Sequence, residues 1–208
     1  MPAFLVIDDH PIVRKGICEI LKEVSGPVSV VEAGDASDAL KKFREGTYDM
    51  ILLDINLPGR SGLDLMEDLN NLDPSARILV ISMYPEQQYA IRALRAGSAG
   101  YLTKESAPDE LVLAVDKILK GGRYITQSIA ESIFDALQQD GPPHESLSNR
   151  ELEVLVMIAK GRNLKEIGEL LSLSERTIST YRSRILEKMG LNSNADLVRY
   201  AIQNNLIE

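Results

Sequence analysis

The sequence has few of the residues on which many metal and hydrolytic sites depend. Its 208 residues include one cysteine, Cys18, and two histidines, His10 and His144. A single cysteine excludes an internal disulfide and a cysteine-cluster metal site, and two histidines exclude a histidine-rich one. A Ser-His-Asp triad would have to use one of these histidines, and neither lies in a recognisable nucleophile motif.

Long hydrophobic runs are also absent. No apolar run approaches the roughly 18 residues of a membrane span, and the chain enters its first apolar run without a basic region or a cleavage site. With 44% hydrophobic and 26% charged residues, the chain can bury ordinary cores. We therefore expect a soluble, cytoplasmic protein without a membrane partner, built as one large domain or two modest ones.

The net charge of −8 is unevenly distributed along the chain. Residues 1–124 have an acidic excess, and residues 125–145 contain acids but neither Lys nor Arg. Residues 146–208 hold nine basic and eight acidic groups. The overall field would not attract nucleic acid, so any DNA binding must come from a local basic patch in the C-terminal part.

The first 120 residues alternate between short apolar runs and helical patterns. This (βα)5 alternation predicts an α/β fold, a doubly wound parallel sheet with helices on both faces. The expected strands are 3–7, 28–32, 49–53, 77–81 and 99–103. The expected helices are near 11–24, 36–45, 62–70, 86–96 and 108–120.

The pattern of the remaining residues predicts a linker followed by a small all-α domain. Residues 125–139 have the apolar spacing of a helix, and the polar, proline-containing stretch 138–145 predicts an exposed hinge. Capping signals then stand at Ser148 with Glu151, Asn163 with Glu166, Ser174 and Gly190. They predict four helices near 149–160, 164–171, 175–189 and 194–203. The three-residue connection between the second and third suggests a helix-turn-helix. The predicted domains are 1–122 and 147–208, joined by a partly helical linker, 123–146.

Polar residues follow four of the expected strands: Asp8 and Asp9, Asp54, Ser82 and Lys104. The carboxyl ends of parallel strands meet at one edge of a sheet, so these side chains should converge. Facing carboxylates repel one another unless a cation lies among them, and Mg²⁺ prefers oxygen ligands. Asp54 would be a carboxylate nucleophile, with the Lys104 ammonium and the Ser82 hydroxyl binding phosphoryl oxygens. Each residue alone is more often a helix cap or a solvated charge, but their combination predicts a phosphorylation switch.

The motifs that contain these residues resemble the receiver domain of bacterial two-component response regulators. They are Val6–His10, Leu52–Gly59, Val80–Ser82 and Gly100–Lys104, within a resemblance that covers residues 3–120. The resemblance implies that Asp54 accepts a phosphoryl group from a sensor histidine kinase.

The same resemblance implies Mg²⁺ as cofactor and a switch that responds to phosphorylation. The implied ligands are Asp9 and Asp54 directly, the backbone carbonyl of Asn56, and Asp8 through water. Ser82 and Tyr101 would form the switch pair. For Tyr101, a plain buried aromatic is an equally good interpretation of the sequence alone.

The expected helix 175–189 has the distribution of apolar and polar residues typical of a helix that contacts DNA bases. Ile178, Ile185 and Met189 form an apolar stripe, and hydroxyl and basic side chains lie on the other faces. Between residues 176 and 188, four basic side chains stand against Glu187 alone. Such a helix suits the DNA major groove. A solvated amphipathic helix is the alternative.

Three segments of the C-terminal part, Leu147–Leu155, Lys165–Gly168 and Leu173–Ile178, resemble the LuxR/NarL-type helix-turn-helix. The whole chain is thus similar to a transcriptional regulator of the NarL/FixJ class. The resemblance implies base contacts from Ser179, Thr180 and Ser183, where the family often carries Lys or Asn. The other DNA-binding candidates are Lys165, Arg176, Thr177, Arg182, Arg184 and Lys188.

The resemblance also implies a homodimer on double-stranded DNA, formed through the last helix. The candidates for that contact are Leu197, Val198, Ala201 and Ile202. The same four residues could equally be intramolecular core.

We therefore predict a phosphorylation-activated transcription factor that is not an enzyme. One alternative is a DNA-binding regulator with an inactive receiver, independent of phosphorylation. The other is a Mg²⁺-dependent phosphohydrolase that uses Asp54 as nucleophile. Such enzymes usually have a second acid two residues later for proton transfer, where this chain has Asn56.

Overall fold

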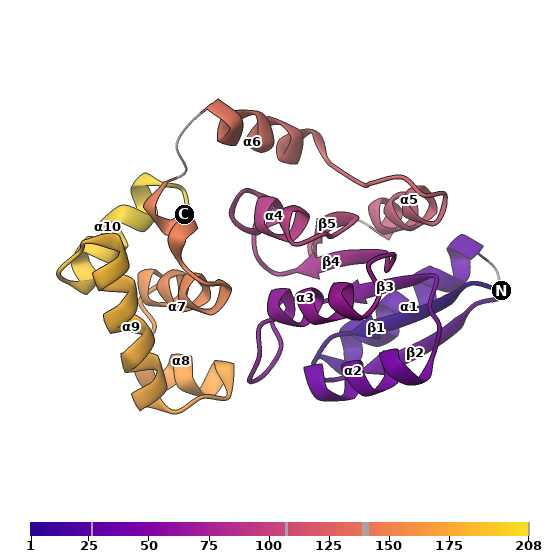
Figure 1. The fold of residues 1–208 in the computed structure, drawn as a ribbon, viewed down its shortest axis with the longest axis horizontal. Helices are drawn as coiled ribbons and strands as arrows, with labels where there is room; N and C mark the ends of the chain where they lie inside the picture. Colours follow the sequence, from indigo (N-terminus) through magenta and orange to yellow (C-terminus); the bar gives the residue numbers. More distant parts are fainter. Residues whose placement is uncertain (26, 107, 139–141, 208) are drawn as a thin grey trace. The chain divides into compact units, whose positions relative to one another are not determined.

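The computed structural model describes residues 1–25, 27–106, 108–138 and 142–207. The chain forms two compact units, the first holding nearly all residues up to Gln138 and the second the helices that follow (Figure 1). None of the helices in the described part is both long enough and apolar enough to cross a membrane.

The first unit contains a five-stranded, all-parallel sheet in the order β2-β1-β3-β4-β5. The strands are β1 Ala3–Ile7, β2 Ser29–Ala33, β3 Met50–Leu53, β4 Ile78–Ser82 and β5 Gly100–Thr103. Each bound agrees with the prediction to within one residue. The three central strands, β1, β3 and β4, are almost wholly buried, because helices cover both faces of the sheet.

Five helices connect and follow the strands, and they confirm the doubly wound prediction. They are α1 Pro11–Ser25, α2 Ala36–Glu45, α3 Gly62–Leu72, α4 Glu86–Arg95 and α5 Pro108–Leu119. Helices α1 and α5 pack together, with Ile17 and Val115 buried against Phe4 and Leu52 of the sheet. Helices α2 and α3 pack together on the opposite face (Figure 1).

The strand order fixes where a site can form. Strands β1 and β3 are neighbours, with Ile7 paired to Leu53. From β1 the chain adds β2 on one side and then β3, β4 and β5 on the other, so the order of strands reverses between β1 and β3. Ligand sites of open α/β sheets lie beyond the carboxyl ends of the strands at such a reversal. Asp8 and Asp54, which follow the two paired residues, therefore stand side by side.

A sixth helix, α6 Gln127–Gln138, belongs to the first unit, and it confirms the helix expected after residue 124. It packs against α4, and Ile129 is buried. The Thr126 hydroxyl accepts a hydrogen bond from the amide of Ile129 at 3.3 Å and donates one to the Glu86 carboxylate at 2.7 Å. Thr126 thus starts α6 and ties it to the first residue of α4. The predicted domain boundaries at 122 and 147 stay a prediction.

The second unit is all-helical, as predicted. Its elements are η1 Pro143–Ser146, α7 Asn149–Ala159, α8 Leu164–Leu171, α9 Glu175–Met189 and α10 Asn194–Gln203. Both predicted capping boxes are present, Ser174 caps α9, and Gly190 ends α9 in the left-handed conformation.

The last part of the stretch 138–145, for which a hinge is expected, contains a short ordered turn. Residues 139–141 lie outside the described residues, but Pro143–Ser146 forms a 3₁₀ turn. That turn is ordered by α10, because the Tyr200 hydroxyl lies 2.8 Å from His144 Nδ1 and 3.3 Å from its backbone nitrogen.

The connection between α8 and α9 depends on a close backbone approach. Ser172 adopts a left-handed conformation with φ 55°, and the amide of Leu173 donates to the Gly168 carbonyl at 2.8 Å. A Cβ atom at Gly168 would lie 2.7 Å from the carbonyl oxygen of Leu173. Only glycine fits there without a backbone shift.

We predict opposite effects of two glycine-to-alanine substitutions on stability. Gly168→Ala should lower the free energy of unfolding of the second unit by about 1–3 kcal/mol, because the turn must open. Gly16→Ala, on α1 with no atom near its Cβ position, should raise that of the first unit by about 0.5–1 kcal/mol. Chemical denaturation followed by circular dichroism measures both. Equal effects would contradict the steric argument.

Candidate functional site

Three of the predicted site residues meet at the carboxyl edge of the sheet. Asp8 and Asp54 are 2% and 1% exposed, and the Lys104 side chain is 7% exposed. The Lys104 ammonium lies 2.6 Å from Asp8 Oδ2 and 2.6 Å from Asp54 Oδ2. One cation therefore bridges two buried carboxylates from neighbouring strands.

The ionisation of this cluster reflects both burial and pairing. Burial raises the pKa of Asp54, and the Lys104 ammonium offsets part of that effect. Burial opposes the charged form of Lys104, but the Asp54 and Asp8 carboxylates outweigh it and raise the pKa of Lys104. The lysine is therefore a fixed positive charge directed at Asp54.

The backbone that follows Asp54 packs closely around this residue. Asp54 Oδ1 accepts a hydrogen bond from the Asn56 amide at 3.0 Å, which holds Asn56 beside the site. The Gly62 amide donates to the Ile55 carbonyl at 2.8 Å. A Cβ atom at Gly62 would collide with the carbonyl oxygen of Asp54, so glycine is required there.

Ser82 and Tyr101, the predicted switch pair, are linked through Tyr84. Ser82 Oγ donates to Asn56 Oδ1 at 3.4 Å and accepts from the Tyr84 amide at 3.1 Å. The buried Tyr101 hydroxyl donates to the Tyr84 carbonyl at 2.8 Å. Burial raises the pKa of Tyr101, so it remains a donor. A movement of the Ser82 side chain can therefore be transmitted to Tyr101 through the backbone of Tyr84.

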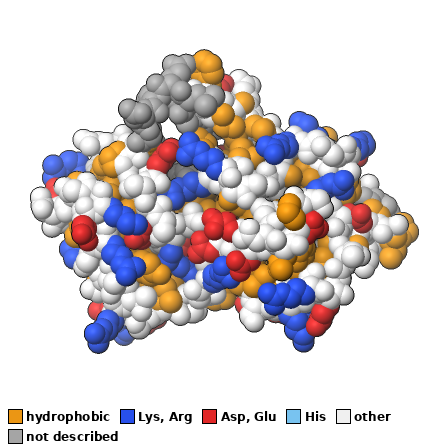
Figure 2. Space-filling model, in the orientation of Figure 1, with side chains coloured by type: hydrophobic (Ala, Val, Ile, Leu, Met, Phe, Trp, Pro, Cys, Tyr) orange, Lys and Arg blue, Asp and Glu red, His pale blue; other side chains and the backbone are white. Residues whose placement is uncertain are grey.

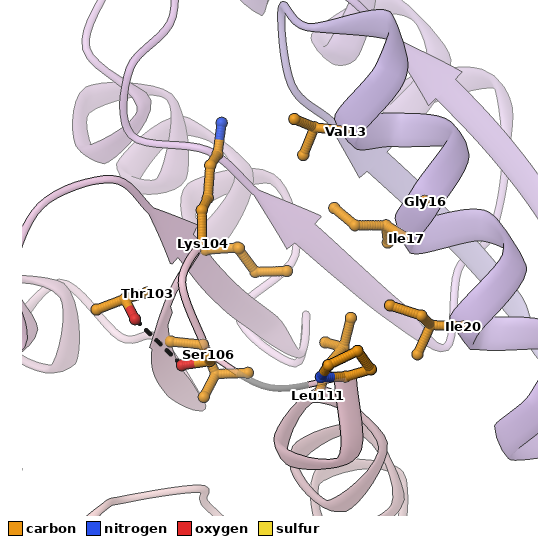
Figure 3. Close-up of a pocket in the computed structure, with 11 residues that line it drawn as sticks. Val13, Gly16, Ile17, Ile20, Thr103, Lys104, Ser106 and Leu111 are labelled. Atoms are coloured by element: carbon orange, nitrogen blue, oxygen red, sulfur yellow. Dashed lines mark hydrogen bonds between the residues drawn. The ribbon is translucent and has the colours of Figure 1, made fainter.

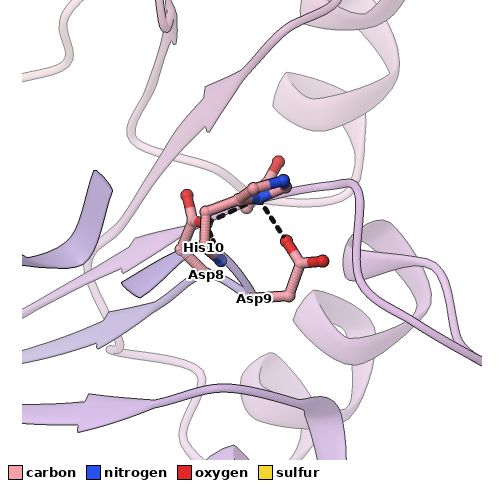
Figure 4. A group of neighbouring side chains, drawn as sticks. Asp8, Asp9 and His10 are labelled. Carbon is pink, nitrogen blue, oxygen red and sulfur yellow. Dashed lines mark hydrogen bonds and ion pairs between the residues drawn. The ribbon is translucent and has the colours of Figure 1, made fainter. Parts of the chain in front are cut away.

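Asp9 and His10 stand at the more exposed side of the cluster (Figure 4). The Asp9 side chain is 34% exposed and that of His10 64% exposed. His10 Nδ1 lies 2.6 Å from Asp9 Oδ1 and 3.3 Å from Asp8 Oδ1. Asp9 Oδ1 is itself shielded from solvent, and its close polar neighbour is the His10 imidazole.

The donor atoms of this cluster suit a divalent cation. One ligand atom from each of Asp8, Asp9, His10 and Asp54 can be chosen so that all lie within 4.8 Å of one another. Ligands of an octahedral Mg²⁺ at about 2.1 Å are separated by roughly 3 Å or 4 Å. The carboxylate oxygens of Asp8, Asp9 and Asp54 lie within 4.8 Å of one another and are the kind of ligand that this ion prefers. The residues present therefore fit Mg²⁺.

A cavity of about 220 Å³ lies behind Lys104, between α1 and α5 (Figure 3). Its walls are mainly apolar and include Ile17, Ile81 and Leu111, with the aliphatic stem of Lys104 along one side. One side of the stem therefore borders a mainly apolar hollow, while the ammonium reaches the carboxylates.

In the second unit, α9 buries Ile178 and Ile185 and exposes the three predicted base-contacting residues, Ser179, Thr180 and Ser183. These three line one open hollow together with Leu164, Glu175 and Arg176. The hydroxyls of Thr180 and Ser183 donate to the backbone carbonyls of Arg176 and Ser179, which leaves their acceptor electron pairs for a ligand.

The other predicted DNA-binding residues divide into two groups. Lys165, Arg176 and Arg184 are exposed. Thr177, Arg182 and Lys188 have partners within the unit: Ser174 at 2.7 Å, Asn194 at 2.5 Å and Glu151 at 2.6 Å. On the face shown in Figure 2, basic and acidic side chains are interspersed over the helical unit, so positive charge is local rather than general.

Two of the predicted dimerisation residues are placed elsewhere by the structure. Leu197 and Ala201 are fully buried within the second unit, so they belong to its core, which was the alternative for these positions. Helical periodicity turns them towards α7, against which α10 packs. Val198 is partly buried and Ile202 is 54% exposed, and these two stay available.

Comparison with known proteins identifies both units. The response regulator receiver domain matches residues 4–116, and the bacterial regulatory proteins of the luxR family match residues 145–201. The chain belongs to the two-component response regulators. It is a transcription regulator of a phosphorelay, with a receiver unit followed by a luxR-family DNA-binding unit.

Relatives of this response regulator match it along almost its whole length. The response regulator UvrY of Escherichia coli K12 is 36% identical over 207 residues, which cover 97% of this chain and 94% of UvrY. The response regulator GacA of Pseudomonas aeruginosa is 35% identical over 208 residues, covering 98% and 97%. Among solved structures, RcsB of Salmonella enterica serovar Typhimurium, bound to the rprA promoter with phosphomimetic BeF₃⁻, is similar with a TM-score of 0.65. It is 26% identical, over 96% of this chain and 98% of RcsB.

Two residues at the receiver site were missed from the sequence. Arg14 donates to the Asp8 carbonyl at 2.6 Å and pairs with Glu32 at 2.9 Å, so it anchors the chain at the acidic pair. No sequence signal separates it from a solvated helix arginine. His10 could have been found, because it directly follows Asp8 and Asp9.

For the DNA-binding unit, we predict that Lys188 is structural and Arg184 is a DNA contact. Lys188→Met should lower the free energy of unfolding by about 1–3 kcal/mol, because buried Glu151 loses a partner. Lys188 and the Ser148 cap outweigh burial and hold the pKa of Glu151 below its usual value. The stabilisation is therefore present at neutral pH and is lost as the pH falls through that pKa.

Arg184→Met serves as the comparison for that prediction. It should leave the free energy of unfolding nearly unchanged. The slope of log DNA affinity against log salt concentration should become less steep by about one unit. Unfolding curves and DNA titrations at several salt concentrations measure both variants. If instead Lys188→Met left stability intact and reduced the salt slope, Lys188 would be the DNA contact.

Proposed function

We propose that Asp54 accepts a phosphoryl group from a sensor histidine kinase and that a homodimer of the phosphorylated protein binds promoter DNA. A carboxylate oxygen of Asp54 forms the new bond to phosphorus as the bond to the donor nitrogen breaks. The observation that carries this proposal is the Lys104 ammonium, held 2.6 Å from Asp54 at the edge of the sheet.

The chain offers a set of oxygen ligands for Mg²⁺. We assign Asp9 and Asp54 as direct ligands, with the backbone carbonyl of Asn56, and Asp8 as a ligand through water. When bound, Mg²⁺ would neutralise charge on the phosphoryl oxygens. Arg14 holds the Asp8 carbonyl, so the two acids at the end of β1 are positioned before the cation arrives.

Phosphorylation changes the charge that Lys104 and Ser82 face. The phosphoryl group adds about −1.5 to −2 charge and several strong acceptor oxygens. Lys104 exchanges one carboxylate oxygen for a phosphoryl oxygen, and the Ser82 hydroxyl, which donates to Asn56 at 3.4 Å, turns to the same group. The Tyr84 amide then loses its acceptor, and the loop that Tyr101 holds through the Tyr84 carbonyl rearranges.

The loop at Tyr84 leads directly into α4, which gives the switch a route to α6. Glu86 is the first residue of α4 and accepts the hydrogen bond from Thr126, the cap of α6. A shift of α4 therefore acts on the helix that precedes the second unit. We propose that α6 transmits the switch.

The DNA-binding unit would act through α9. We propose base contacts from Ser179, Thr180 and Ser183 and phosphate contacts from exposed Lys165, Arg176 and Arg184. This is supported by the similarity to RcsB, which has been solved bound to promoter DNA and as two dimers on two parallel DNAs. Val198 and Ile202 are the remaining α10 candidates for a dimer contact. Chromosomal DNA as partner favours a cytoplasmic location.

We propose no turnover of phosphate esters. Two residues after Asp54, where a proton-transferring acid would stand, is Asn56, whose side chain accepts from Ser82. The complete set of Asp8, Asp9, Asp54 and Lys104 also favours a receiver that can be phosphorylated over an inactive one.

We predict that Asp54 is the only phosphorylated residue. Incubation with Mg²⁺ and acetyl phosphate should add one base-labile phosphoryl group to the wild type and none to Asp54→Asn, because the acyl phosphate needs the carboxylate. Intact mass measures the adduct. No adduct, or the same adduct in the variant, would remove Asp54 from its proposed role.

A second prediction concerns the hydrogen bond between α6 and α4. Thr126→Val keeps the shape of the side chain but cannot donate to Glu86, so phosphorylation should proceed while the gain in DNA affinity that it produces becomes smaller. The ratio of DNA affinities with and without acetyl phosphate measures this gain. Thr47→Val, at an exposed threonine between α2 and β3, is the matched control. A ratio in Thr126→Val equal to that of the wild type would exclude this route.

A further inference from the structure

A separate hollow lies in the first unit, at the edge of the sheet opposite to Asp54. Its volume is about 310 Å³, and it is bordered by the last turn of α2, the end of α3 and the segments that lead into β3 and β4. Its lining includes two aromatic rings, an aliphatic side chain and two opposite charges, from Phe43, Tyr48, Leu72, Arg44 and Asp73. This mixture of groups is not used by the phosphorylation site.

The two aromatic rings of this hollow are held in place. The Phe43 and Tyr48 rings are nearly parallel, with centroids 6.4 Å apart and planes inclined by 14°. The Tyr48 hydroxyl donates to the Lys42 carbonyl at 3.0 Å, which fixes the ring beside the last turn of α2. A Cβ atom at Gly46 would lie 2.7 Å from that hydroxyl, so the glycine leaves room for the ring. A further aromatic ring can therefore pack against a surface that is already formed.

A positive and a negative side chain line the same hollow. Arg44 is exposed, and no carboxylate of the described chain forms an ion pair with its guanidinium. Asp73 Oδ1 accepts hydrogen bonds from the amide and the hydroxyl of Ser75, at 2.9 Å and 2.6 Å. These bonds hold the pKa of Asp73 below its usual value, so the carboxylate is ionised at neutral pH. The hollow thus offers one cation and one anion that do not pair with each other.

The size and the charges of the hollow match one class of small molecule. A cavity of about 150 Å³ accommodates benzene, so this larger hollow has room for an aromatic ring with a short polar group attached. A guanidinium binds a carboxylate well, and a carboxylate binds an ammonium. An aromatic acid without an ammonium would leave Asp73 facing a like charge, whereas a zwitterion pairs with both side chains.

We propose that this hollow binds an α-amino acid with an aromatic side chain. The ligand's carboxylate pairs with Arg44, its ammonium pairs with Asp73, and its ring packs against Phe43 and Tyr48. Because the hollow joins the ends of α2 and α3, the bound ligand stabilises that layer of the receiver unit. This inference goes beyond the proposed function and does not rest on it, because the hollow lies away from Asp54.

The test uses L-phenylalanine as the probe, titrated into the isotopically labelled full-length protein and followed by NMR. For a ligand of this size in an open hollow we expect a Kd on the order of 0.1–1 mM, with saturable shifts in the amide resonances of the lining residues. Glycine has both charges but no ring, and 3-phenylpropionate has the ring and the carboxylate but no ammonium. Each should bind about tenfold more weakly than L-phenylalanine.

Two variants test the charged partners. Arg44→Gln and Asp73→Asn should each weaken L-phenylalanine binding about fivefold or more, because each leaves one charge of the zwitterion unpaired. Asparagine keeps an oxygen that can accept from Ser75, so the turn after α3 is retained. Arg123→Gln, at an exposed arginine outside the hollow, is the matched control and should leave the affinity unchanged.

The inference is overturned if L-phenylalanine produces no saturable shift up to about 10 mM, or shifts only residues outside the hollow. Equal affinities of wild type and Arg44→Gln, or of glycine and L-phenylalanine, would overturn it as well. None of these results bears on the proposed function, which is measured separately by the phosphoryl adduct at Asp54.

Discussion

The bridge from Lys104 to Asp8 and Asp54 is the interaction on which the rest of the receiver unit depends. Two buried carboxylates from adjacent strands would repel each other, and burying either of them is unfavourable by several kcal/mol in isolation. One ammonium, 2.6 Å from each, offsets this. Because the two carboxylates share the Lys104 ammonium, a group that adds negative charge to Asp54 changes how the ammonium divides its interactions between them. The surrounding hydrogen bonds then change as well.

The sheet order provides this arrangement. The short side chains of Asp8 and Asp54 can share one cation because the order β2-β1-β3-β4-β5 makes β1 and β3 neighbours. Lys104 follows the edge strand β5 and reaches both carboxylates with its long stem, which borders a mainly apolar hollow. The length of this side chain lets its charged end exchange one oxygen for another, which suits a switch that responds to one added group.

Much of the fold and of the receiver site could be predicted because the signals are local. Apolar runs and the caps at Ser148, Asn163 and Ser174 define elements through neighbours a few residues away. What could not be predicted depends on partners distant in sequence. Lys188 meets Glu151 across 37 residues, and Thr126 meets Glu86 across 40. The spacing of Leu197 and Ala201 is the same whether they lie in a core or in a dimer contact. Their burial within the second unit is what identifies them as core residues.

DNA affinity as a function of phosphorylation at Asp54 shows whether this protein is a phosphorylation switch. A binding sequence is first selected from a random DNA pool with the protein in acetyl phosphate and Mg²⁺. Affinity for it is then measured at fixed salt concentration for wild type and Asp54→Ala, with and without the phosphodonor. If phosphorylated Asp54 activates the protein, the phosphodonor should tighten DNA binding in the wild type alone. Equal affinities under all four conditions would contradict it and leave a DNA-binding protein controlled in another way.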